Sequence, residues 1–240
     1  MCKRLWQPVH RLAWLTVFSV LVGVTPVGAA AIGSISPQET VVKITEEFVS
    51  ALIKDAVAVK QDPMRGVQLA HTLLVPHLDF ERFSRWVLGK HWRSATPEQR
   101  IRFVTEFTQS LVMTYATAMT SFVDEIISLS KSVIYPPARY RNGDTEAMVP
   151  MRIRLATGGE AEVRYRLHLN EDRWMIYDVT VQGVSLATTY RMSYNTLIQE
   201  KGLDGLLEYI ETRNRSRRYP CPSAISKCGS SGQDKSNSGL

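Results

Sequence analysis

Residues 149–169, VPMRIRLATGGEAEVRYRLHL, contain two runs in which apolar and polar side chains alternate on either side of a glycine pair. Successive side chains of a β-strand point to opposite faces, so each run predicts a strand with one apolar face and one charged face. Gly158-Gly159 predicts the turn between the strands, and residues 174–181 supply a further strand. The region therefore predicts an antiparallel meander. Its outer face carries Arg152, Arg154, Arg164 and Arg166, near Glu160 and Glu162.

Helical patterns precede and follow this sheet. Ser36-Pro37-Gln38-Glu39 and Thr96-Pro97-Glu98-Gln99 each combine an N-cap, a first-turn proline and an acid or amide three residues after the cap. The second signal opens the longest helix, whose apolar residues recur at every fourth position from Phe103 to Met119. Helical spacing returns after Gly183. The order of elements predicts an α+β fold, in which N-terminal and C-terminal helices close a curled antiparallel sheet of about four strands.

The first 31 residues have the pattern of a secretory signal peptide. A basic segment precedes an uncharged run from Leu12 to Val24, and the small residues Gly28 to Ala31 follow. The run is too short to span a bilayer, which needs about 20 residues. We therefore expect a cleaved leader over 1–31, a single domain over 32–212, and a basic, Ser- and Gly-rich tail over 213–240. Cleavage predicts a soluble protein of the periplasm.

The net charge of +6 arises at the two ends of the chain. Three of the 29 basic residues lie in the leader and six lie from Arg213 onward, whereas all acids except Asp234 lie between these segments. The predicted domain is therefore close to neutral, and it lacks the basic footprint of a nucleic-acid-binding protein. The run from Arg213 to Arg218 has two interpretations, a solvated end or a contact with anionic headgroups or a partner.

No catalytic residue is predicted. Ser185, His168 and Asp178 could be imagined as a triad, but no nucleophile-elbow motif surrounds the serine. His168 falls in the polar register of its strand, which favours a surface histidine. Asp178 is interpreted as a hydrogen-bonded structural carboxylate, with a functional buried acid as the alternative.

Metal and cofactor sites are also not predicted. The spacings of His71, His77 and His91 match no standard zinc pattern. Cys221 and Cys228 could close a small disulfide loop in an oxidising compartment. The Gly158-Gly159 turn lacks the helix that a phosphate-binding loop requires.

An ordered set of motifs resembles the MlaC, or toluene-tolerance auxiliary, family. The segments that carry the resemblance are Pro76-x-Leu78-Asp79-Phe80, Leu88-Gly89-Lys90-x-Trp92-Arg93, Ala95 to Arg100, Phe103-x-x-Glu106-Phe107, Tyr177-Asp178-Val179, Gly183 to Leu186 with Tyr190-Arg191, and Lys201 to Leu206. Together they span roughly residues 36–211. The tail after Arg213 departs from the family pattern, so it could mask or add a docking surface.

The resemblance implies a strongly curved, cone-like antiparallel sheet related to the nuclear-transport-factor fold, with an apolar cavity for the acyl chains of a glycerophospholipid. It also implies two membrane partners for a carrier without enzymatic activity. These are an inner-membrane ABC transporter with an MCE-type ring and an outer-membrane lipoprotein–porin complex. A lipid such as a hopanoid, an adaptor without ligand, and a hydrolase or isomerase on the same fold remain alternatives.

We expect the long helix and the apolar face of the sheet to enclose the acyl chains. The residues expected to bind lipid are Phe103, Phe107, Leu111, Tyr115, Val149, Met151, Ile153, Val163, Tyr165, Leu167, Trp174 and Ile176. Each buried methylene contributes roughly 0.8 kcal/mol, so two long acyl chains require an extensive apolar lining. The same residues would also suit an ordinary packed core.

Overall fold

The computed structural model describes residues 35–141 and 143–217. The predicted leader, Cys221 and Cys228, and the part of the predicted tail beyond Arg217 lie outside these residues. The described chain begins with α1 (Pro37–Lys54), α2 (Ala56–Gln61), α3 (Pro63–Leu73), the 3-10 turn η1 (Val75–His77), α4 (Phe80–Leu88), α5 (Lys90–Ser94), α6 (Pro97–Thr120) and α7 (Val123–Ser130). It continues with β1 (Val133–Ile134), β2 (Glu146–Arg154), β3 (Glu160–Asn170), β4 (Arg173–Val181), β5 (Val184–Ser185) and α8 (Leu186–Ser216).

Both predicted capping boxes form. The Ser36 hydroxyl accepts a hydrogen bond from the Glu39 amide at 3.1 Å, and the Glu39 carboxylate accepts one from the Ser36 amide at 2.8 Å. The Thr96–Gln99 pair at the start of α6 repeats this arrangement. The backbone leaves helical geometry at Asp55, which ends α1 and separates it from α2.

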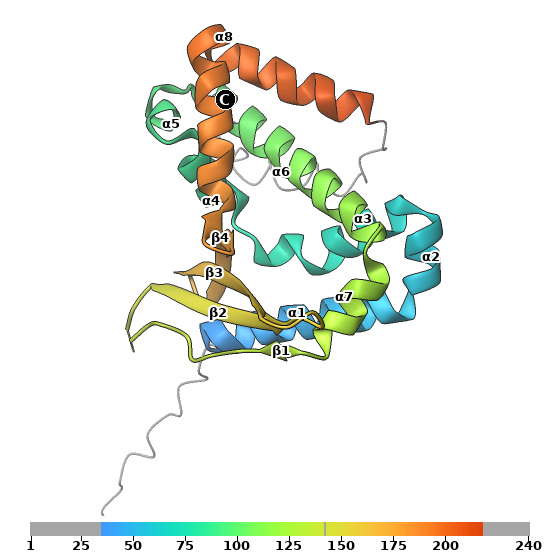
Figure 1. The fold of residues 1–240 in the computed structure, drawn as a ribbon. Coiled ribbons are helices and arrows are strands. Elements are labelled where there is room, and N and C mark those ends of the chain that lie inside the picture. The colour runs from blue at the N-terminus through green and yellow to red at the C-terminus, as the bar shows by residue number, and fades with distance from the viewer. Residues whose placement is uncertain (1–34, 142, 218–240) are drawn as a thin grey trace, which may run out of the picture. The chain divides into compact units, whose positions relative to one another are not determined.

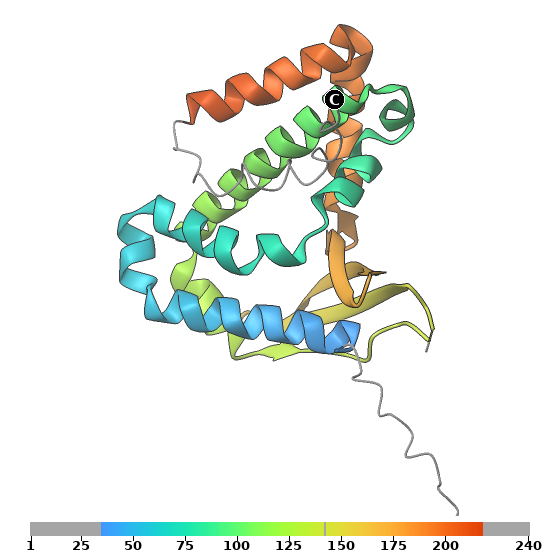
Figure 2. The same ribbon diagram turned by 180° about the vertical axis from the view of Figure 1, so that it is seen from behind.

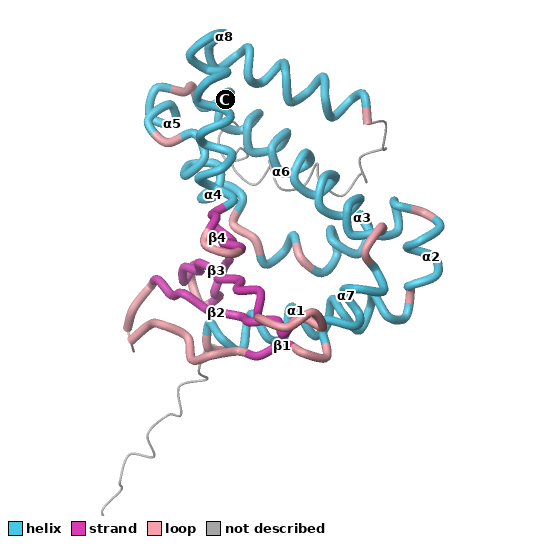
Figure 3. The backbone as a smooth tube through the Cα atoms, in the orientation of Figure 1, coloured by secondary structure: helices cyan, strands magenta, loops and turns pink. Residues whose placement is uncertain are grey.

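The predicted meander is an open antiparallel sheet in the order β1-β2-β3-β4-β5. Figure 3 shows its strands in magenta, next to one another and apart from most of the helices. Val149 pairs with Tyr165, and Leu167 pairs with Ile176. The sheet has five strands over the described residues, close to the expected four, and two of them, β1 and β5, are only two residues long. The β3–β4 register shifts between Arg166 and Leu167, and such a bulge bends a strand and increases its twist.

Helix α1 covers one end of the apolar face of the sheet (Figure 2). Its Val41 and Ile44 pack against a cluster that includes Val149, Leu167 and Ile176. Further along α1, Phe48 and Leu52 pack against α2 and α7 instead. One helix therefore joins the sheet to the helices that follow it.

The other helices form a second layer in which α6 lies beside α8 and α4 (Figure 1). Helix α8 bends at Gly202, where φ is 73° and ψ is 176°, a conformation that glycine reaches without a steric penalty. Its C-terminal limb runs beside α6, and the Asn214 amide donates to the Glu106 backbone carbonyl at 2.9 Å. The expected tail boundary at Arg213 is therefore too early, since the helix continues to Ser216 and Asn214 is buried.

Candidate functional site

Seven of the twelve predicted lipid-binding residues pack against protein side chains. Phe103, Phe107 and Leu111 share a cluster with side chains of α4 and α8, and the Phe107 ring lies 5.4 Å from Phe83 and 5.2 Å from Tyr190. Four residues of the sheet lie in the cluster that α1 covers, namely Val149, Leu167, Trp174 and Ile176. The long helix and the sheet thus have separate packed cores.

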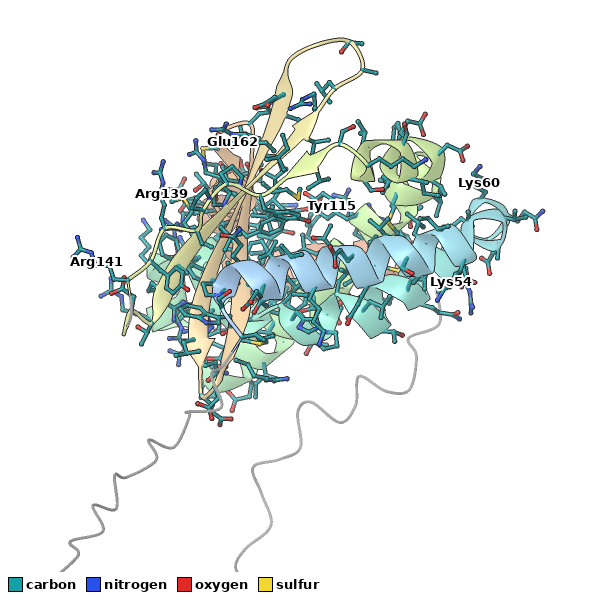
Figure 4. The ribbon with its side chains drawn as sticks, turned by 90° about the horizontal axis from the view of Figure 1, so that it is seen from below. Lys54, Lys60, Tyr115, Arg139, Arg141 and Glu162 are labelled. Atoms are coloured by element: carbon teal, nitrogen blue, oxygen red, sulfur yellow. The ribbon has the colours of Figure 1, made fainter. Side chains whose placement is uncertain are left out.

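The other five residues are not buried members of a packed cluster. Met151 and Val163 are buried at positions outside the three clusters, Ile153 is partly buried, and Tyr165 is partly buried and packs against the cluster of the sheet. Tyr115 is 46% exposed although it continues the apolar stripe of α6. Figure 4 shows Tyr115 in the space between the strands and α7, beyond α1. The far end of α6 and one half of the sheet therefore present apolar side chains that the protein does not fully cover.

Tyr190 of α8 was not predicted as a site residue, and it lies beside Tyr115. Burial, together with the neighbouring Tyr115 phenol, raises the pKa of Tyr190 above its usual value. Its ring also packs edge-on against Phe107. Tyr190 therefore connects the packed part of α6 to the exposed part. Leu186, Tyr190 and Tyr194 recur at helical spacing, but spacing alone does not identify the helix that this face contacts.

Tyr165 lies deep in the protein and still keeps accessible surface. Desolvation raises the pKa of its phenol well above the usual value, and the nearby Tyr135 raises it further. The Tyr165 hydroxyl lies 3.8 Å from the Met151 sulfur. The side chain is partly buried and packs, together with Tyr135, against the cluster that α1 covers.

A pocket of about 450 Å³ opens between α1 and the segment that joins α7 to β1. Its walls are Thr45, Glu46, Val49, Ser50, Ile53, Lys54, Ser130, Val133 and Tyr135. Burial raises the pKa of Tyr135, and a hydrogen bond with Thr45 opposes this shift. Tyr135 thus borders the pocket and also neighbours the Tyr165 phenol. No local sequence pattern indicates this pocket, because its two walls lie about 80 residues apart in the chain.

The opposite face of the sheet is covered by α4 and holds a polar and aromatic cluster. The Tyr177 hydroxyl donates to the Glu146 carboxylate at 2.7 Å, and burial with this hydrogen bond raises the pKa of Tyr177 to about 12. The His168 Nε2 lies 2.6 Å from the Asp79 carboxylate, and His168 is only 9% exposed. The expectation of a surface histidine was wrong, since α4 and its N-cap cover this part of the polar face.

The residues considered for a triad are not assembled as one. The Ser185 hydroxyl donates to Asp178 at 2.8 Å, and the Ala187 amide donates to the same carboxylate at 3.1 Å. His168 is paired with Asp79 instead. Asp178, which is 1% exposed, therefore fixes the start of α8, and its interpretation as a structural carboxylate is confirmed.

Over 35–141 and 143–217, no group of three His, Cys, Asp or Glu side chains is arranged to hold a metal ion. In the same ranges, none of the helices combines the length and the hydropathy of a membrane span.

The chain is similar to two characterised sequences. It is 22% identical over 203 residues to the Intermembrane phospholipid transport system binding protein MlaC of Haemophilus influenzae, covering 82% of this chain and 91% of that protein. It is 26% identical over 170 residues to the Toluene tolerance protein ttg2D of Pseudomonas putida, covering 70% of this chain and 76% of that protein.

The fold is also similar to a crystal structure of the phospholipid-binding protein from Ralstonia solanacearum in complex with a phospholipid. The TM-score is 0.65 at 26% sequence identity, covering 75% of this chain and 97% of that one. The family model described as "MlaC protein" matches residues 43–212. The motifs, the α+β fold and these similarities agree, and the chain belongs to the MlaC family.

Proposed function

We propose that this protein is a periplasmic carrier that binds a glycerophospholipid by its acyl chains and passes it between membranes. The observation that carries this proposal is the match of the family model to residues 43–212, together with the phospholipid bound to the structural relative from Ralstonia solanacearum. The partly uncovered apolar side chains of α6 and the sheet are consistent with such a ligand.

Within the predicted lining, the residues with accessible surface are the first candidates for contact with acyl chains. Tyr115, Ile153 and Tyr165 have such surface, and Met151 and Val163 lie next to Tyr165 on the same face of the sheet. Burial of methylenes supplies the driving force, at about 0.8 kcal/mol for each methylene. The packed residues would then support this wall without contacting lipid, or contact lipid after a rearrangement of side chains. These residues are Phe103, Phe107, Leu111, Val149, Leu167, Trp174 and Ile176.

The pocket between α1 and the α7–β1 segment is our candidate for the mouth of the lipid site. It lies on the side from which Tyr115 is visible in Figure 4. The headgroup would remain there, near the charged side chains of Glu46 and Lys54. This arrangement keeps the charges of the headgroup in contact with water, because burying a charge without a partner is costly.

Transport requires partners on both membranes. The Haemophilus influenzae relative is named as a binding protein of an intermembrane phospholipid transport system. By extension, we propose that this chain is exported and that its leader is cleaved after residue 31. The mature protein then exchanges lipid with an outer-membrane lipoprotein–porin complex and with the MCE-type ring of an inner-membrane ABC transporter. We assign it no catalytic residue and no cofactor, since the bound phospholipid is cargo.

The first experiment is mass spectrometry of an organic extract of the protein, secreted into a bacterial periplasm under its own leader and purified. We expect near-stoichiometric glycerophospholipid, together with an intact mass that corresponds to cleavage after residue 31. Folded protein without lipid would overturn the carrier proposal and favour an adaptor without ligand. A different lipid, such as a hopanoid, would refute the phospholipid assignment.

A further inference from the structure

The Tyr165 hydroxyl is a polar atom on an apolar surface. On β3 it pairs across the strands with Val149 and Val179, and Met151 and Val163 are its neighbours on the same face. Tyr165 packs against the cluster covered by α1, and its phenol is directed toward Met151, which does not belong to that cluster. A hydroxyl group in this position needs a hydrogen-bond acceptor, because polar groups removed from water are destabilising without one.

The acceptor in this structure is weak. The Tyr165 hydroxyl lies 3.8 Å from the Met151 sulfur, and a thioether is a poor acceptor. Tyr135 lines the pocket beside Thr45, and it packs against the same cluster of side chains as Tyr165. Tyr135 therefore connects the pocket to the part of the sheet that carries Tyr165, whose hydroxyl could turn from sulfur to an oxygen atom of a ligand.

The chemistry of that oxygen follows from the surroundings. An apolar wall admits acyl chains. The polar atoms nearest to an acyl chain are those of the ester that links it to glycerol. An ester carbonyl accepts a hydrogen bond from a phenol with ordinary geometry. A phosphate would instead call for cations, and the charged side chains of the pocket, Glu46 and Lys54, lie on the exposed side of α1.

We infer that Tyr165 is a specificity-determining residue whose hydroxyl donates a hydrogen bond to an acyl-ester carbonyl of the bound lipid. This inference rests on the proposed function, and it adds a chemical preference for ester-linked chains over ether-linked chains. Ether-linked lipids of the same length fill the same apolar volume but lack the carbonyl oxygen. The Tyr165 hydroxyl therefore discriminates between the two linkages, independently of the headgroup.

The experiment compares two probes, dioleoyl-phosphatidylglycerol and the dioleyl diether with the same headgroup, in competition for delipidated protein. We expect the wild-type protein to prefer the ester by about three- to tenfold, which corresponds to one neutral hydrogen bond. Tyr165→Phe removes only the hydroxyl group, and we expect it to abolish the preference while both lipids still bind. Tyr140→Phe, which alters a tyrosine that is 38% exposed, is the matched control and should keep the preference.

A measurement on the wild-type protein keeps the test independent of the folding of the variant. With carbonyl-13C-labelled ester lipid, the infrared carbonyl band should shift to lower frequency on binding, relative to the same lipid in an apolar solvent. An equal preference in wild type and Tyr165→Phe, or an unshifted band, would overturn the inference and leave the carrier proposal standing. If neither probe binds the wild-type protein, the proposed function itself fails.

Discussion

The guanidinium carbon of Arg166 on β3 lies 4.7 Å from the centroid of the Trp86 indole on α4. The same carbon lies 5.7 Å from the ring centroid of Tyr177, and the two ring centroids are 6.0 Å apart, so the guanidinium group contacts both rings of one tilted aromatic pair. Arg82 lies over the ring of Tyr177, and Arg191 of α8 lies over Trp86. This stack of arginine side chains against two neighbouring aromatic rings joins two helices to the polar face of the sheet.

Replacement of Arg166 tests the contribution of this stack to stability. We expect Arg166→Ala to lower the free energy of unfolding by about 1–2 kcal/mol, because a partly desolvated cation–π contact and the packing of the side chain stem are both lost. Arg164→Ala is the control, since Arg164 lies on the same strand and forms a partly exposed ion pair with Glu162. That variant should lose under about 1 kcal/mol. Urea unfolding of both variants measures the difference, and equal losses would contradict a stabilising role for the stack.

Asp79 makes two interactions through one carboxylate. One oxygen atom accepts from the Arg82 amide at 2.8 Å and caps α4, while the other lies 2.6 Å from His168 on the sheet. We expect Asp79→Ala to lower the free energy of unfolding by about 2–3 kcal/mol, because an N-cap and a mostly buried hydrogen bond are lost together.

Asp62→Ala supplies the comparison for that variant. Asp62 caps α3 through the Met64 amide and is exposed, so its loss should cost about 1 kcal/mol. Urea denaturation of both variants distinguishes the contribution of the N-cap to the free energy of unfolding from that of the contact with His168. The two-part role of Asp79 is contradicted if the two alanine variants are destabilised equally.

Local interactions were predictable from the sequence, and long-range partners were not. Ser36 and Glu39 form their capping box within one helical turn, and the alternation of Val149 to Leu155 determines which side chains share a face of the sheet. By contrast, the stripe from Phe103 to Tyr115 shows that one side of the helix is apolar, but the stripe does not specify what covers that side. In the structure α4 and α8 cover Phe103 and Phe107, while the sheet packs on α1.

The same limit explains the prediction that failed for His168. Its place in the polar register of β3 is correct, but α4 covers that face and supplies Asp79 as a partner. The tail boundary failed for a similar reason. The contact of Asn214 with Glu106 joins residues more than 100 positions apart, so no local pattern predicts that the helix continues past Arg213.

The partial burial of His71 makes stability depend on pH. Burial lowers the pKa of the His71 imidazole below the ordinary value of 6.5. As the pH falls through that ordinary value, the unfolded chain therefore takes up a proton more readily than the folded chain, and this residue then favours unfolding. Above the ordinary pKa the residue is neutral in both states and has no such effect.

When the pH is lowered from about 7.5 to about 5.5, we expect the free energy of unfolding to fall by less in His71→Gln than in the wild-type protein. Guanidinium unfolding curves at several pH values measure the difference, and the comparison at the upper end of the range corrects for the substitution itself. Parallel decline of the two proteins across the range would contradict this assignment.

Phe107 and Tyr115 lie on the same stripe of α6, and the structure separates their roles. Phe107 has no exposed surface and packs against Phe83 and Tyr190, so Phe107→Ala should lower the free energy of unfolding by about 3–5 kcal/mol. Tyr115 is 46% exposed, so Tyr115→Glu should retain the fold, with a loss of only about 1 kcal/mol. If this part of α6 contacts acyl chains, the introduced carboxylate would have to be desolvated, and we expect the folded variant to copurify with little lipid.

The matched control for Tyr115→Glu is Tyr209→Glu, which alters a tyrosine that is 45% exposed on the C-terminal limb of α8. It introduces the same charge at a similar exposure, away from the space between the strands and α7, and should keep its lipid. Lipid content is measured by mass spectrometry of organic extracts and the fold by thermal unfolding. Normal lipid content in folded Tyr115→Glu would remove α6 from the proposed wall, whereas loss of lipid from both variants would show that added negative charge, and not the position of Tyr115, causes the defect.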